Sequence, residues 1–101
     1  MSKRVTGYKE VNGKSIEVSF WYQESCRNVY KSVFYYVNGK RVTANKKEIK
    51  ELLATAPDIV TANCYFWRPG EHAWERRNNE ERRLAEVYNW LQSEGFKVTE
   101  E

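Results

Sequence analysis

The residues best suited to chemistry lie in one stretch of the chain, residues 64–77, which surrounds a Pro69-Gly70 turn. Its indole rings can stack on a nucleobase or fill a pocket of a partner protein. Its guanidinium groups can pair bidentately with phosphates or carboxylates. The candidate binding residues in this stretch are Trp67, Arg68, Trp74, Arg76 and Arg77. The alternative is structural, with Trp67 in the core and Trp74 fixing the loop to the helix that follows.

A second candidate surface lies on that helix. Arg76, Arg83 and Trp90 recur every seven residues and share one stripe, because a helix turns by about 100° per residue. A stripe of cations and an indole suits a nucleic-acid groove or a protein interface. The alternative is an ordinary solvated face, since opposite charges recur here at i,i+4 spacing. By the same rotation of about 100° per residue, Arg77 lies on nearly the same side of the helix as Leu84. Arg77 is therefore expected to point toward the core if the helix begins before residue 77.

Basic and aromatic residues also alternate along the amino-terminal half, where Trp21, Lys31 and Tyr36 are the candidates and Arg4 and Arg41 lie nearby. Residues 1–50 contain eleven Lys and Arg against four Glu, a net charge of +7, whereas residues 51–101 carry −4. Several folds bind single strands on such a sheet face, because bases stack on the rings and phosphates meet the cations. The alternative is a solvated surface with lysines that protect edge strands.

The residues needed for catalysis are scarce. The chain has one His, His72, and one Asp, Asp58, so a catalytic triad or dyad would have to use His72. Cys26 and Cys64 lack metal-ligand spacing and are expected to be free thiols. No glycine-rich phosphate-binding pattern is present. We therefore expect a non-catalytic protein without a metal or a cofactor.

Two β-hairpins are predicted in the amino-terminal half. Asn12-Gly13 and Asn38-Gly39 are flanked by identical residues, and Asn-Gly favours the positive φ angles of a type I′ turn. After the first turn, Ile16, Val18, Phe20 and Tyr22 alternate with Glu17, Ser19, Trp21 and Gln23. This period of two indicates strands with one buried face.

The carboxy-terminal half is predicted to contain two helices and two strands. Asn45 and Glu48 form a capping pattern for the first helix, and Pro57 ends it. The uncharged run Ile59–Trp67 is predicted to be an interior strand. The second helix begins either after Pro69-Gly70 or at Asn78, and its core stripe consists of Leu84, Val87, Tyr88 and Leu91.

Gly95 is expected to end this second helix, before a final strand around Phe96–Val98. The two strands that flank the helix would then run parallel. The resulting fold class is a single α+β domain over residues 1–101. It has a mixed, mainly antiparallel sheet of about five or six strands, including two N-terminal hairpins, packed by two helices. With no apolar run of about 20 residues and no signal peptide, we expect a cytoplasmic protein with no membrane partner.

Two functional hypotheses follow. The first is a nucleic-acid-binding module for single-stranded or structured RNA or DNA. The second is a small inhibitor or adaptor that binds a nucleic-acid-handling protein of a host. Such proteins are common products of phages and mobile elements, anti-CRISPR proteins included, and the comparison is one of size and composition. A homodimer is a third possibility, because an aromatic sheet face can be buried by self-association.

Overall fold

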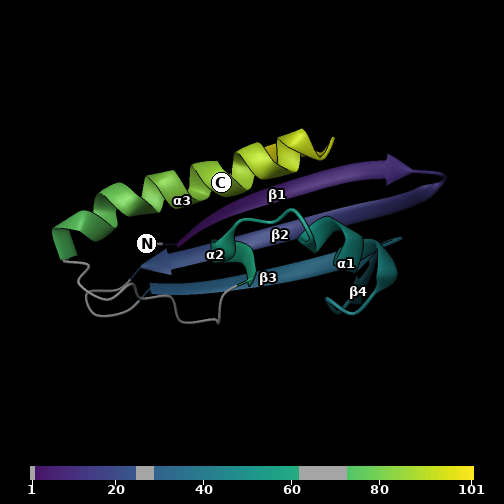
Figure 1. Cartoon of the computed structure of the whole chain (residues 1–101), viewed down its shortest axis with the longest axis horizontal. Coiled ribbons are helices and arrows are strands. Elements are labelled where there is room, and N and C mark those ends of the chain that lie inside the picture. Colours follow the sequence, from purple (N-terminus) through teal and green to yellow (C-terminus); the bar gives the residue numbers. More distant parts are fainter. Residues whose placement is uncertain (1, 25–28, 62–72) are drawn as a thin grey trace.

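The computed structural model describes residues 2–24, 29–61 and 73–101, with side chains for residues 3–23, 31–61 and 82–101. Within these ranges, five strands form one sheet in the order β4-β3-β2-β1-β5, and every neighbouring pair is antiparallel. The strands are β1 (Ser2–Val11), β2 (Lys14–Glu24), β3 (Val29–Val37), β4 (Lys40–Val42) and β5 (Lys97–Glu100). The predicted α+β fold class is confirmed (Figure 1).

Both predicted hairpins are present. The turn residues Asn12 and Asn38 have φ angles of 52° and 53°, and the glycines that follow each have a φ of 79°. These are the positive values that a type I′ turn requires at both central positions. The second turn is also fixed to the neighbouring strand, because the Ser15 backbone N–H donates to Asn38 Oδ1 at 3.0 Å.

The helices are α1 (Lys47–Leu53), α2 (Asp58–Thr61) and α3 (Ala73–Ser93). α1 begins after Lys46, which makes no side-chain capping hydrogen bond, so Asn45 does not cap it as predicted. α3 starts soon after the Pro69-Gly70 dipeptide, and the alternative start at Asn78 is wrong.

The strand predicted from Ile59 onward is wrong where the structure describes it. Asp58–Thr61 forms the short helix α2, and residues 62–67 lie outside the described residues. The backbone N–H of Val60 donates to the Pro57 carbonyl at 2.9 Å, which turns the chain. Ile59 and Val60 are consecutive and both buried. A short uncharged run fits a buried helix as well as a buried strand.

The predicted parallel pair of strands is also wrong, because β5 pairs antiparallel with β1. Gly95, with a φ of 85°, reverses the chain after α3. The N–H of Phe96 donates to the Leu91 carbonyl at 2.9 Å and the N–H of Gly95 to the Gln92 carbonyl at 3.0 Å. This is the Schellman pattern that ends helices at a C′ glycine, so the predicted stop at Gly95 is confirmed.

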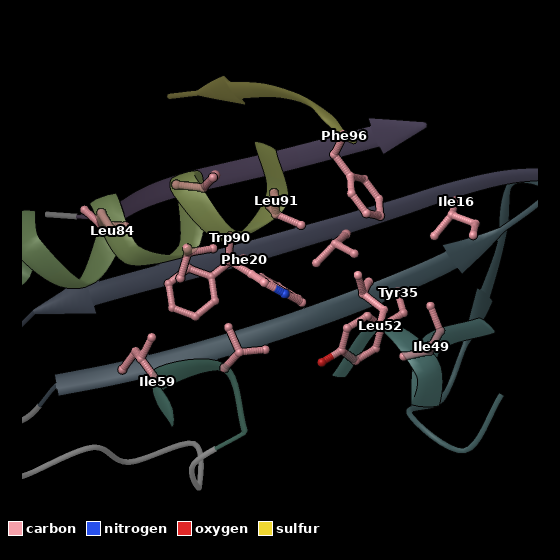
Figure 2. Close-up of a cluster of buried hydrophobic side chains, with 14 of the residues drawn as sticks. Ile16, Phe20, Tyr35, Ile49, Leu52, Ile59, Leu84, Trp90, Leu91 and Phe96 are labelled. Atoms are coloured by element: carbon pink, nitrogen blue, oxygen red, sulfur yellow. The ribbon is translucent and has the colours of Figure 1, made fainter. Parts of the chain in front are cut away.

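One hydrophobic core fills the space between the helices and one face of the sheet (Figure 2). The sheet supplies alternate residues of its strands, among them Val18 and Phe20, which are fully buried. The helices supply Ile49, Leu52, Ile59, Val60, Leu84, Val87, Trp90 and Leu91. Because all three helices contribute to the same cluster, they form a single layer on one side of the sheet.

Gly7 allows α3 to pack closely on β1. A Cβ atom at this position would lie 3.1 Å from Leu91 Cδ1 and 3.2 Å from Phe96 Cβ. Both neighbours are buried, so neither has free space into which to move. The missing side chain therefore sets the distance between the helix and the strand.

We expect Gly7→Val to lower the free energy of unfolding by about 1–3 kcal/mol, because the added carbons overpack this contact. Urea unfolding measures the change. The matched control is Thr6→Val, which places a residue of similar size on the opposite face and should change stability by less than about 0.5 kcal/mol. Equal losses in the two variants would contradict a close contact at Gly7.

α1 is joined to the tip of the first hairpin. Lys14 Nζ lies 3.1 Å from Glu48 Oε1, and both residues line a groove of about 400 Å³. The pKa of Glu48 lies below its ordinary value because the carboxylate accepts a hydrogen bond from its own backbone N–H and another from Lys14. A carboxyl group with a lowered pKa stabilises the fold above its ordinary pKa of 4.5 and ceases to do so as the pH falls through the lowered value.

Glu48→Gln should therefore reduce the loss of stability that accompanies acidification from neutral pH to about pH 3. Urea unfolding at both pH values measures this difference. Glu51→Gln is the control, because Glu51 is an exposed residue of the same helix. If both variants lose stability with acid as the unsubstituted protein does, the Lys14–Glu48 contact makes no contribution in solution.

Candidate functional site

The sheet has a second face, turned away from the helices, which we call the solvent face. Successive residues of a strand point to opposite faces, so the residues between the core positions belong to this face. The residues described on it are Arg4, Thr6, Tyr8, Glu10, Ser15, Glu17, Ser19, Trp21, Gln23, Ser32, Phe34, Tyr36, Arg41, Lys97 and Thr99. All of them except Ser19 are exposed or half-buried, so this face is accessible to a ligand.

The strand register orders these residues into rows that run across the sheet. One row consists of Arg4, Trp21 and Ser32. The next consists of Thr99, Thr6, Ser19 and Phe34. The third consists of Lys97, Tyr8, Glu17, Tyr36 and Arg41. Neighbouring rows are two residues apart, roughly 7 Å along a strand, so small side chains lie between two rows of large ones.

Aromatic rings and guanidinium groups are paired on this face. The guanidinium of Arg4 lies over the Trp21 ring at 4.9 Å from its centroid, and that of Arg41 lies over the Phe34 ring at 4.6 Å. Attraction between a cation and a ring face holds each pair together. Tyr8 and Trp21 are 44% and 37% exposed, which makes them two of the three large apolar side chains that the described residues present to solvent.

The charges on the solvent face are mixed. Arg4, Arg41 and Lys97 supply positive charge, and Glu10 and Glu17 supply negative charge. Glu10 accepts a hydrogen bond from the Tyr8 hydroxyl at 3.0 Å, and this bond raises the pKa of Tyr8. Arg4 also pairs with the carboxylate of Glu101 at the end of β5. The arginines are thus held in place on the face rather than extended into solvent.

A hollow of about 210 Å³ lies within the solvent face. Its lining residues are Arg4, Thr6, Glu17, Ser19, Trp21, Tyr36 and Thr99. Thr99, Thr6 and Ser19 are small and adjacent across three strands, so they form its floor. Side chains of the flanking rows form its walls. The hollow can therefore accept a flat group between an indole and a phenol ring.

Two sequence candidates, Trp21 and Tyr36, lie together at this hollow. Phe34 and Lys97 also lie on the solvent face, although their sequence context alone does not single them out. The strand register is what identifies them as residues of this face, because Phe34 is paired with Ser19 and Lys97 is paired with Tyr8.

Lys31 does not belong to this surface, and its prediction as a binding residue is corrected. It is only 7% exposed, and its Nζ donates to the Val60 carbonyl of α2 at 2.6 Å. Lys31 is opposite Tyr22 in the register, on the core face of the sheet. Its ammonium group therefore fastens α2 to β3.

The predicted surface stripe on α3 is also wrong. Arg83 is 1% exposed and Trp90 is 6% exposed, so both face the core. Among the α3 side chains that the structure describes, residues 82–93, the buried ones are Arg83, Leu84, Val87, Trp90 and Leu91. This set is turned by roughly 50° from the predicted apolar stripe. Arg83 Nη1 donates to the Tyr22 hydroxyl at 3.2 Å, and Trp90 Nε1 donates to Thr55 Oγ1 at 3.2 Å. Hydrogen-bonding partners inside the fold thus allow these two polar side chains to be buried.

The remaining candidates lie outside what the structure describes. Trp67 and Arg68 are outside the described residues, as are Cys26, Cys64 and His72. Trp74, Arg76 and Arg77 belong to α3, but their side chains are outside the description, so the predicted core position of Arg77 stays a prediction. Within the described ranges, no group of three or more His, Cys, Asp or Glu residues could hold a metal ion. No helix in those ranges is long and apolar enough to cross a bilayer.

The chain was compared with protein-family models, curated proteins and solved structures, and none of them matches it.

We expect Tyr22→Phe to lower the free energy of unfolding by roughly 1.5–3 kcal/mol, because it removes a buried hydrogen bond from a charged donor. Tyr35→Phe is the matched control. Burial raises the pKa of Tyr35, and no hydrogen bond to its hydroxyl is found among the described residues. Urea unfolding of both variants measures the difference. Equal stability of the two variants would show that the Arg83–Tyr22 contact does not fix α3.

Proposed function

We propose that this chain binds single-stranded nucleic acid on the solvent face of its sheet. The observation that carries the proposal is the arrangement of rings and cations in adjacent rows. Trp21 and Phe34 lie on neighbouring strands, one row apart, at a diagonal spacing of about 7–8 Å. Rings at this spacing can stack on successive bases of one strand, since every base has a face on which an aromatic ring can stack.

The cations are placed to meet the phosphates. Arg41 on β4 and Lys97 on β5 lie at opposite edges of the sheet, and Arg4 lies between them on β1. A strand that crosses the sheet would pass from one cation to the next while its bases meet the rings between them. Neutralising phosphates releases counterions, so the affinity should fall as the salt concentration rises.

The second candidate is the inhibitor or adaptor that binds a nucleic-acid-handling protein. It is favoured by the carboxylates of Glu10 and Glu17, which lie among the cations of the solvent face. Uniform positive potential would suit a polyanion better, whereas mixed charge suits a protein surface. The exposed rings would then be the anchors of a protein interface.

The test is fluorescence anisotropy of labelled oligonucleotides of about 12 nucleotides, both DNA and RNA, at ~50 and ~200 mM salt. We expect binding that weakens with salt. Arg41→Gln and Lys97→Gln should each reduce the salt slope by about one. Trp21→Thr keeps a residue that strands favour and should weaken binding by about 1–3 kcal/mol.

The matched controls are Lys47→Gln and Lys50→Gln, which remove the same charge from α1 on the other side of the sheet. They should leave the salt slope nearly unchanged. If Arg41, Lys97 and the α1 lysines contribute equally, binding is a property of the net charge and not of the solvent face. If no oligonucleotide binds at either salt concentration, the second candidate replaces the first.

A further inference from the structure

The carboxylate of Glu17 is the unusual group of the solvent face. Glu17 lies on β2, opposite Tyr8 on one side and Tyr36 on the other. It is half-buried and lines the hollow together with Arg4 and Trp21. No ion pair or hydrogen bond to its carboxylate is found among the described side chains. Because Glu17 lines the hollow and its carboxylate is not occupied by a described protein partner there, it can accept hydrogen bonds from a ligand that enters the hollow.

The size of the hollow limits what can meet this carboxylate. Clefts that enclose a drug-sized ligand measure roughly 300–1,000 Å³, and the hollow measures about 210 Å³. It is also bounded by the rings of Trp21 and Tyr36 over a floor of small hydroxyl residues. These dimensions and walls fit one flat heterocycle, such as a base of a bound strand.

The chemistry of the carboxylate then selects among the bases. An ionised carboxylate only accepts hydrogen bonds, and its two oxygens lie side by side. Guanine presents two adjacent donors on its pairing edge, N1–H and the N2 amino group. Adenine and cytosine present one donor beside an acceptor, and uracil and thymine present one donor between two acceptors. Only the guanine edge satisfies both oxygens without placing a lone pair against one of them.

The opposite end of the hollow complements the same base. Arg4 lines it, and its guanidinium is held over the Trp21 ring at 4.9 Å. Guanidinium groups donate readily to the O6 and N7 acceptors of guanine. A donor group and an acceptor group therefore line one hollow, in an arrangement that complements the polarity of guanine.

We propose that the hollow is a guanine-selective subsite and that Glu17 determines its specificity by accepting hydrogen bonds from N1–H and N2–H. This inference rests on the proposed binding of single strands to the solvent face. It adds a base preference that stacking and phosphate contacts do not supply, because those contacts tolerate every base.

The experiment compares the affinities of labelled (dGdT)6, (dIdT)6, (dAdT)6 and (dCdT)6 by anisotropy at ~50 mM salt. Inosine lacks the N2 amino group and so removes one of the two donors. We expect the unsubstituted protein to bind (dGdT)6 roughly 10-fold more tightly than the other strands, as one bidentate contact would give. Glu17→Gln should remove this preference, since an amide presents one acceptor and one donor.

Glu10→Gln is the matched control, because Glu10 is a glutamate on the same face, one row away from Glu17, and lies outside the hollow. Both variants gain the same charge, so any general increase in affinity should be equal in the two. Glu10→Gln should keep the guanine preference. Circular dichroism and urea unfolding of both variants check that the fold is retained.

The other outcomes overturn the inference in distinguishable ways. If the unsubstituted protein binds all four strands equally, the guanine subsite is wrong and the proposed function stands. If guanine is preferred but Glu17→Gln keeps the preference, another group reads the base. If no strand binds, the inference and the proposed function both fail.

Discussion

The alternation of side chains along β2 is the constraint on which the rest of the structure depends. Among the described strands β2 is the central one of the sheet, with β1 on one side and β3 on the other. The side chains of its odd and even positions point to opposite faces of the sheet, so Phe20 is buried in the core and Trp21 is exposed to solvent. A shift of one residue in register would exchange the two sets. The core and the candidate binding face are therefore fixed together by the same hydrogen-bonded ladders.

Polar contacts add to the apolar packing that holds the helical layer on the core face of the sheet. Lys31 joins β3 to α2 through the Val60 carbonyl, and Arg83 joins α3 to Tyr22 of β2. Both cations are buried, so their hydrogen bonds add directional contacts to the apolar packing. Because the three described helices pack on the core face, Tyr8 and Trp21 on the opposite face stay exposed.

Two aromatic rings of the solvent face are paired with arginines. Isolated apolar side chains on a surface need no explanation, but here each arginine over a ring is already oriented (Arg4 over Trp21, Arg41 over Phe34). Preorganised side chains lose less conformational entropy when a ligand binds. The hollow between the rows adds a polar site with Glu17 in its wall. The proposals thus place stacking, phosphate contact and base selection side by side on one face, with Glu17 as the group that selects the base.

The sequence by itself determined the features that depend on near neighbours. The Asn-Gly turns, the alternation of β2, the stop at Gly95 and the placement of Trp21 beside basic residues follow from local backbone preferences and a period of two. The tertiary structure decided the features that depend on distant partners. Ile59 entered a helix, β5 paired with β1, and Arg83 and Lys31 became buried. A long cationic side chain is compatible with either environment, and hydrogen-bond acceptors supplied by remote segments, such as Tyr22 for Arg83, determine which one it occupies.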